Sequence, residues 1–80
     1  MKKVKITTEY ITLGQFLKFV GLIDCGSYAK HFLIENKVLI NNEQDQRRGR
    51  KLYKGDVVVI FNESYEVDKV EDWKNKIKEF

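Results

Sequence analysis

The hydrophobic pattern changes from a helical period to a strand period along the chain, and this change restricts the fold more than any other feature. Apolar residues fall at i, i+3, i+4 and i+7 from Leu13 and at i, i+3 and i+4 from Ala29, which predicts two short helices. Residues 38–40 and 57–61 are instead continuous apolar runs, and the second predicts a central, largely buried strand. The sequence therefore predicts an α+β fold, with a helical hairpin packed on a small, mainly antiparallel sheet.

Residues that favour helix ends flank both predicted helices. Thr12 and Gln15 have the spacing of a capping box, in which each side chain pairs with the backbone amide of the other residue. The second helix is expected over about residues 28–35, with Ser27 as its cap and Asn36 in a left-handed conformation at its end. The connection between the helices is short, which favours their packing as a hairpin.

Short strands and turns are expected around this hairpin. Residues 3–7 alternate polar and apolar side chains, which predicts an edge strand. Asn41 and Asn42 predict a tight hairpin turn, because asparagine tolerates a positive φ. Residues 65–67 predict a last strand. A helical pattern with an acidic cap then begins at Asp68, so we expect a C-terminal helix that covers the sheet.

Length and composition exclude several classes of protein. The 80 residues make a single domain, 1–80, and a domain of this size buries only about 60% of its unfolded surface, which leaves little room for a catalytic cleft. Cys25 is the only cysteine and His31 the only histidine, so we expect no disulfide, metal, cofactor or enzymatic activity. No window approaches about 18 consecutive apolar residues, and no signal-peptide pattern is present. We therefore expect a cytoplasmic protein without membrane association.

Residues 47–54, here called the cationic loop, hold five cations and no acidic residue. Residues 1–61 carry eleven Lys and Arg against six Asp and Glu, a net charge of +5, whereas residues 62–80 carry four against six, a net charge of −2. A positive surface of this kind attracts polyanions such as nucleic acid. The alternative is a solvated loop without a partner, since Lys and Arg are common on surfaces.

Five short motifs occur in order at compatible spacing. They are Leu13-Gly14-Gln15-Phe16-Leu17-Lys18, Gly21-Leu22, Ser27-Tyr28-Ala29-Lys30, Val38-Leu39-Ile40-Asn41 and Lys54-Gly55-Asp56-Val57-Val58. Together they resemble the S4 RNA-binding domain family over about residues 11–61, with residues 62–80 as a C-terminal extension. Within that family the chain looks most similar to the single-domain YaaA/YbcJ-like type, which has a basic Arg-Arg-Gly-x-Lys-Leu segment in its loop.

The resemblance implies an L-shaped helix–helix–hairpin motif, the alpha-L motif, that binds structured RNA through helix 2 and the hairpin loop. The residues expected to contact RNA are Lys30, His31, Lys37, Asn41, Arg47, Arg48, Arg50, Lys51 and Lys54. The chain departs from the family pattern in two places. The usual Arg-Leu-Asp opening of helix 1 is Thr12-Leu13-Gly14, and the usual Arg before helix 2 is Gly26, so two expected cations are missing. The cationic loop is the expected substitute for them.

The function implied by the resemblance is non-catalytic binding of ribosomal or transfer RNA, as a ribosome- or RNA-associated accessory factor. If five cations each neutralise one phosphate, log K should fall with log salt at a slope of about −3.5 to −4.5. Two other functions remain open. The chain could be a protein-interaction adaptor that uses its acidic C-terminal helix and exposed aromatic residues, or it could bind DNA without sequence preference.

Overall fold

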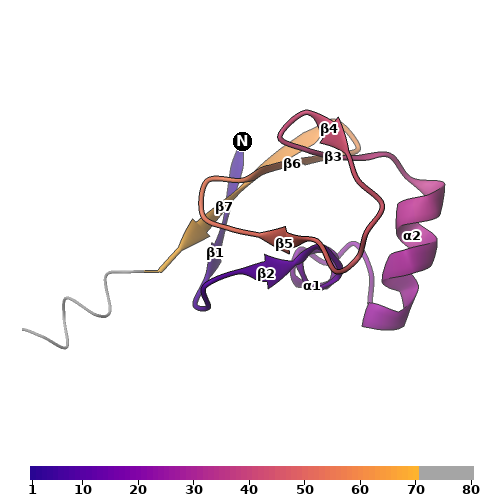
Figure 1. The fold of residues 1–80 in the computed structure, drawn as a ribbon, viewed down its shortest axis with the longest axis horizontal. Helices are drawn as coiled ribbons and strands as arrows, with labels where there is room; N and C mark the ends of the chain where they lie inside the picture. Colours follow the sequence, from indigo (N-terminus) through magenta and orange to yellow (C-terminus); the bar gives the residue numbers. More distant parts are fainter. Residues whose placement is uncertain (71–80) are drawn as a thin grey trace, which may run out of the picture.

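A computed structural model of the chain describes residues 1–70, which form two sheets, two α-helices and one 3₁₀ helix (Figure 1). The strands are β1 (Lys2–Ile6), β2 (Ile11–Thr12), β3 (Val38–Ile40), β4 (Glu43–Gln44), β5 (Lys51–Leu52), β6 (Val57–Ile60) and β7 (Glu63–Lys69). The helices are α1 (Leu13–Phe19), the 3₁₀ helix η1 (Gly26–Tyr28) and α2 (Ala29–Glu35). These elements confirm the predicted α+β class.

Five strands form the main sheet in the order β1-β7-β6-β3-β4. Among the strands of residues 1–70, only the β1–β7 pair is parallel, so the predictions of a mainly antiparallel sheet and of an N-terminal edge strand are confirmed. β6 lies between β7 and β3, and its Val58 and Ile60 are almost fully buried, as expected for a central strand. Phe61 was expected in that strand but lies beyond its end and is 60% exposed. β2 and β5 form a separate two-stranded ladder.

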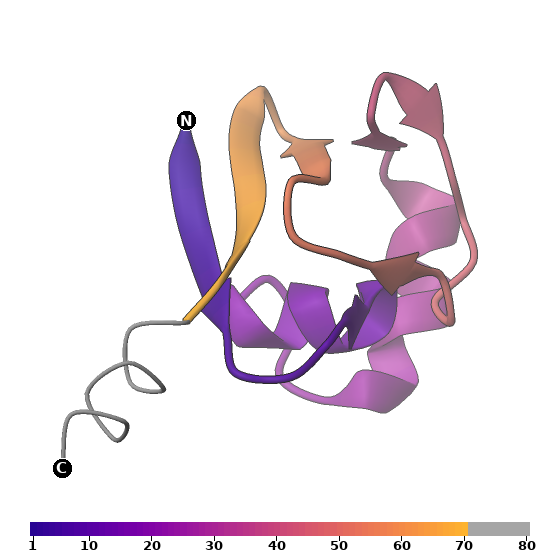
Figure 2. The same cartoon turned by 60° about the vertical axis from the view of Figure 1, so that its left-hand side comes forward.

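The hydrophobic core lies between the helices and the sheet, and Figure 2 shows both helices below the upright strands. Leu13, Phe16 and Leu17 of α1 are completely buried, as their helical spacing predicts. The ring of Phe16 meets Tyr65 of β7 edge-on, with centroids 5.6 Å apart. Burial of each such large apolar side chain stabilises the fold by about 1.5–3 kcal/mol. This packing fixes α1 against the sheet.

The start of α1 is the predicted capping box. The backbone N–H of Gln15 donates to Thr12 Oγ1 at 3.3 Å, and the backbone N–H of Thr12 donates to Gln15 Oε1 at 3.1 Å. Just beyond the other end of the helix, Gly21 has a φ of 82°, a conformation that glycine adopts without strain. Local sequence signals therefore define both ends of α1.

The ends of α2 differ from the prediction. Ser27 does not cap the helix, because the chain enters α2 through η1 and the Ser27 hydroxyl is instead hydrogen-bonded to Cys25 Sγ at 3.1 Å. Asn36 is extended, with a φ of −126°, and its side-chain amide donates to the Phe32 carbonyl. The left-handed prediction for Asn36 is wrong because the chain passes directly from α2 into β3. Phe32, expected to be buried, is half-buried.

The turn between β3 and β4 is built as predicted. Asn41 and Asn42 both have positive φ, at 52° and 73°, the combination that a two-residue hairpin of type I′ requires. Phe61 and Asn62 form a similar turn between β6 and β7, with φ values of 53° and 65°. Asparagine tolerates this conformation, whereas Phe61 is an unusual residue for it.

The C-terminal helix predicted from Asp68 does not begin there. β7 continues through Lys69, because Asp68 and Lys69 lie in parallel register with Lys5 and Ile6 of β1. The rest of the predicted helix, residues 71–80, lies outside the described residues. Among the helices that the structure describes, none has the length and apolar character needed to span a membrane.

Candidate nucleic-acid interface

The cationic loop is attached to the first turn of α1 by its backbone. The N–H of Leu13 donates to the carbonyl of Arg50 at 2.7 Å, and the N–H of Gly14 donates to the carbonyl of Arg48 at 2.8 Å. The first amides of a helix have no partner within the helix itself, so the loop supplies acceptors that α1 needs. The backbone of the loop is therefore placed by the helix, although its sequence has no secondary-structure pattern.

Gly14 makes this close approach possible. A Cβ at position 14 would lie 3.3 Å from the Cβ of Ala29 and 3.4 Å from the carbonyl oxygen of Arg48. Position 14 is therefore the point where α1, α2 and the cationic loop meet. The glycine that stands where the resembled pattern has aspartate has a structural reason in this chain: it leaves room for Ala29 of α2 and for the Arg48 carbonyl.

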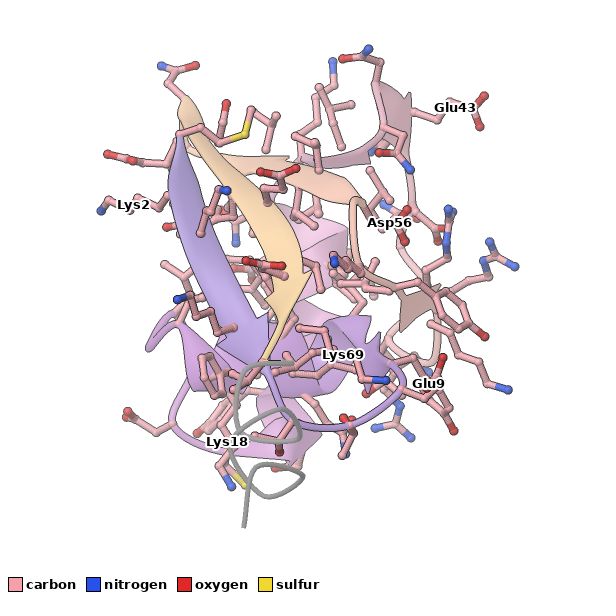
Figure 3. All side chains as sticks on the ribbon, turned by 90° about the vertical axis from the view of Figure 1, so that its left-hand side faces the viewer. Lys2, Glu9, Lys18, Glu43, Asp56 and Lys69 are labelled. Atoms are coloured by element: carbon pink, nitrogen blue, oxygen red, sulfur yellow. The ribbon has the colours of Figure 1, made fainter. Side chains whose placement is uncertain are left out.

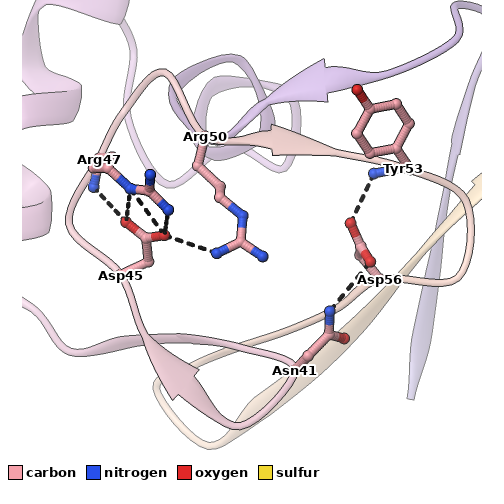
Figure 4. Close-up of polar contacts among 6 residues, drawn as sticks. All are labelled: Asn41, Asp45, Arg47, Arg50, Tyr53 and Asp56. Carbon is pink, nitrogen blue, oxygen red and sulfur yellow. Dashed lines mark hydrogen bonds and ion pairs between the residues drawn. The ribbon is translucent and has the colours of Figure 1, made fainter.

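Asp45, just before the cationic loop, holds two of the loop's arginines (Figure 4). Its Oδ1 accepts the backbone N–H of Arg47 at 2.8 Å, and its Oδ2 accepts Nη2 of Arg47 and Nη1 of Arg50, each at 2.8 Å. The Asp45 side chain is only 8% exposed, whereas that of Arg47 is 73% exposed. The carboxylate therefore lies beneath the loop, and Arg47 covers it from the solvent side.

These contacts shift the charge equilibrium of both partners. Hydrogen bonds from the Arg47 side chain, with smaller contributions from its backbone N–H and from Arg50, hold the pKa of Asp45 well below its ordinary value. Burial opposes this shift but is outweighed. The same contact raises the pKa of Arg47. Asp45 and Arg47 are therefore both ionised at neutral pH, and one negative charge offsets part of the positive charge of the loop.

The remaining cations of the loop are exposed. Arg48 makes no side-chain hydrogen bond or ion pair within the described residues, and its Cβ lies close to position 14 at the junction of the two helices. Lys51 places its Nζ over the ring of Tyr10, 4.9 Å from the ring centroid. Lys54 is also exposed. Arg48 is thus the loop cation best placed to meet a ligand that also contacts α2.

The candidates on and after α2 divide between the two ends of the helix. Lys30 directly follows Ala29, which contacts position 14, so Lys30 lies at the end of α2 nearest to Arg48. Lys37 lies beyond the other end, before β3. His31 is exposed and its Nε2 lies 2.6 Å from Glu35 Oε1, one turn along the helix. Lys30 therefore follows directly on the α2 residue that meets position 14 beside Arg48, whereas His31 is paired within the helix.

Asn41 has a structural role in the β3–β4 turn. Its side-chain N–H donates to Asp56 Oδ1 at 3.1 Å, and its side-chain oxygen accepts the backbone N–H of Val57 at 2.9 Å. Both ends of the amide are therefore engaged within the protein. Contact between Asn41 and RNA remains a prediction from the resemblance.

Sequence reasoning missed three residues of this surface: Asp45, Tyr10 and Tyr53. The Asp45 spacing of two residues from Arg47 and five from Arg50 was visible, but a loop has no period that would predict contact. Tyr10 and Tyr53 are far apart in the sequence and meet only because β2 pairs with β5. Within residues 1–70, no group of three or more His, Cys, Asp and Glu side chains has a geometry suited to a metal ion.

The fold is that of an S4 domain, and the S4 domain family model matches residues 4–68. The chain therefore belongs to the S4 domain family. It is also similar to a curated protein of Bacillus subtilis (strain 168), described as "Probable ribosome maturation protein RlbA". The two are 61% identical over 57 residues, which cover 71% of this chain and 80% of the relative.

Proposed function

We propose that this protein binds structured RNA without catalysis and acts in ribosome maturation, with ribosomal RNA as its ligand. Membership of the S4 domain family supports RNA as the ligand, and the Bacillus subtilis relative supports the ribosomal context. The observation that carries the proposal is the junction at Gly14, where α1, α2 and the cationic loop meet and exposed Arg48 and Lys30 lie nearby.

This arrangement suits the shape of folded RNA. The major groove of an A-form helix is deep and narrow, so proteins hold such RNA mainly through phosphate, ribose and shape contacts. Arg48 offers a planar fork that fits two phosphate oxygens, whereas Lys30 offers a point charge. Because the loop backbone is bonded to α1, these two cations are held on elements that are already ordered before RNA arrives.

Because Asp45 binds Arg47 and Arg50, these two arginines are poor choices for variants that test RNA binding. Replacing Arg47 or Arg50 would remove contacts to the buried Asp45 as well as positive charge, so lost binding would have two causes. The double variant Arg48→Ala/Lys30→Ala removes charge only from exposed side chains. Lys3→Ala is a matched control, since Lys3 is also exposed but lies on β1, at the opposite edge of the sheet from β4.

The experiment is ultraviolet crosslinking in cells followed by sequencing of the bound RNA, with co-sedimentation on ribosomal particles. Wild-type protein and Lys3→Ala should enrich one ribosomal RNA site, and the double variant should lose most of that signal. In direct titrations the double variant should bind roughly tenfold or more weakly, since hydrogen bonds to charged groups contribute about 1.5–3 kcal/mol each. Enrichment of transfer RNA would redirect the proposal to that RNA.

Two results would contradict the proposal. Equal affinity for duplex DNA and RNA of the same length, with no enriched site, would indicate nonspecific nucleic-acid binding. Co-sedimentation that persists unchanged in the double variant and after ribonuclease treatment would favour the protein-interaction adaptor.

A further inference from the structure

Two tyrosines form an exposed aromatic pair, and one of them, Tyr53, belongs to the cationic loop. The ring centroids of Tyr10 and Tyr53 are 5.8 Å apart, with an angle of 47° between the ring planes. Tyr10 is 38% exposed and Tyr53 is 45% exposed. Neither ring belongs to the hydrophobic core, so the pair forms a partly open aromatic surface.

The pairing of β2 with β5 explains why these rings face outward. Ile11 pairs with Leu52, and both side chains are buried. Tyr10 directly precedes Ile11, and Tyr53 directly follows Leu52. Because successive side chains of a strand point to opposite faces, both tyrosines point away from the buried face. Lys51 shares that outer face and reaches diagonally across it, with its Nζ 4.9 Å from the centroid of the Tyr10 ring.

The backbone around both rings is held in place. The N–H of Tyr53 donates to Asp56 Oδ2 at 2.8 Å, and in Figure 4 the Tyr53 ring points away from that carboxylate. The carbonyl of Tyr10 accepts the hydroxyl of Thr8 at 2.7 Å. A rigid aromatic side chain on an ordered backbone loses little conformational entropy when it binds a flat partner.

The charges near the pair favour an anionic ligand. Lys51 lies two residues before Tyr53 in the sequence, and its Nζ lies over the ring of Tyr10. The acidic residue nearest to Tyr10 in the sequence is Glu9. Its carboxylate lies 2.8 Å from Lys69 Nζ, and both residues are labelled in Figure 3. The acidic residue nearest to Tyr53 in the sequence is Asp56, whose oxygens accept hydrogen bonds from Tyr53 and Asn41. A phosphate beside the rings would therefore meet Lys51.

We propose that the Tyr10–Tyr53 pair is a stacking site for one unpaired base of the RNA, with Lys51 holding the adjacent phosphate. The proposal rests on the proposed function and adds a preference for RNA that presents a bulged or single-stranded nucleotide next to a helix. Every base has a π-face, so such a site binds by stacking and tolerates different sequences. The arginines of the cationic loop would contact the paired region, and the tyrosines would contact the base that leaves it.

The test uses two hairpin RNAs at low salt that differ by one nucleotide. One is fully paired, and the other carries a single unpaired 2-aminopurine, whose fluorescence falls when the base stacks. The full chain should bind the bulged hairpin about tenfold more tightly and quench its fluorescence, since stacking of one base is worth about this factor or more. The variant Tyr10→Leu/Tyr53→Leu should bind both hairpins equally, whereas Tyr10→Phe/Tyr53→Phe should keep the preference and the quenching.

Thermal unfolding of each variant separates a lost site from a lost fold, and Tyr53→Leu alone serves if the double leucine variant does not fold. Equal affinity of the wild-type chain for the two hairpins would overturn the stacking site and leave the proposed function standing. A preference that survives in the leucine variant would also overturn it. Failure to bind either hairpin would overturn the proposed function itself, and the stacking site with it.

Discussion

Asp45 shows how one acidic residue organises a basic surface. It is the only charged residue that is buried among residues 1–70, and it accepts hydrogen bonds from the backbone and side chain of Arg47 and from the side chain of Arg50. Repulsion among the clustered cations would otherwise spread the loop. The carboxylate reduces that repulsion, and it leaves Arg48 and Lys51 directed to solvent.

The first prediction concerns Asp45→Asn. The substitution removes the charge from a carboxylate that is held by two arginines, so it should lower the free energy of unfolding by about 1–3 kcal/mol at pH 7. The pKa of Asp45 is depressed in the folded protein relative to an unfolded value of about 3.9. Its stabilising effect is therefore present above about pH 4 and lost as the pH falls further. Urea unfolding at pH 7 and pH 3 measures the difference.

Asp24→Asn is the control, because Asp24 is exposed and forms no ion pair within the described residues. It should change the unfolding free energy very little at either pH. If the difference between wild type and Asp45→Asn were as large at pH 3 as at pH 7, the charge of Asp45 would not be what stabilises the loop.

At the scale of elements, local signals predicted the parts and non-local pairing decided the rest. The Thr12–Gln15 capping box and the Asn41–Asn42 turn depend on neighbouring residues, so the sequence predicted them correctly. Asp68 carries a similar local signal for a helix, but its pairing with Lys5 across the parallel β1–β7 ladder keeps it in a strand. That contact joins residues far apart in the chain, and no nearby residue indicates it.

The candidate site divides in the same way. Its cations could be read directly from the sequence, because charged residues are visible without a fold. Which of them are free to meet a ligand could not be predicted, since this depends on the burial of Asp45 and on the docking of the loop at Gly14. The Tyr10–Tyr53 pair was equally hidden, because it needs the β2–β5 register.

The second prediction tests the docking of the loop on α1. Gly14→Val would place side-chain carbons against Ala29 and the Arg48 carbonyl, where a single Cβ already comes within 3.3 Å and 3.4 Å. Overpacking of this kind typically costs about 1–3 kcal/mol, so the variant should unfold at lower urea concentration. RNA affinity should also fall, because Arg48 and Lys30 would move apart. Circular dichroism and RNA titration measure the two effects.

Gly49→Val is the matched control for that prediction. Gly49 lies in the same loop, but a Cβ there would meet nothing within 4 Å and its φ is not positive. It should leave stability and RNA affinity nearly unchanged. Equal effects of the two substitutions would mean that the loop tolerates no added side chain anywhere, and that the contact at Gly14 has no special role.

At the scale of the whole molecule, the number of cations available to RNA is smaller than the sequence count. Arg47 and Arg50 share the charge of Asp45, and the exposed cations around the loop and α2 that form no ion pair within residues 1–70 are Arg48, Lys51, Lys30 and Lys37. If each neutralises one phosphate, log K should fall with log salt at a slope of about −3 to −3.5, shallower than five loop cations would give.

Arg48→Ala should reduce the steepness by about 1, as expected for one lost phosphate contact, whereas Lys3→Ala on β1 should leave it unchanged. Titrations of one RNA at several salt concentrations measure all three slopes. An equal loss in both variants would mean that RNA responds to the total charge of the molecule, and the contact between Arg48 and RNA would then have to be abandoned.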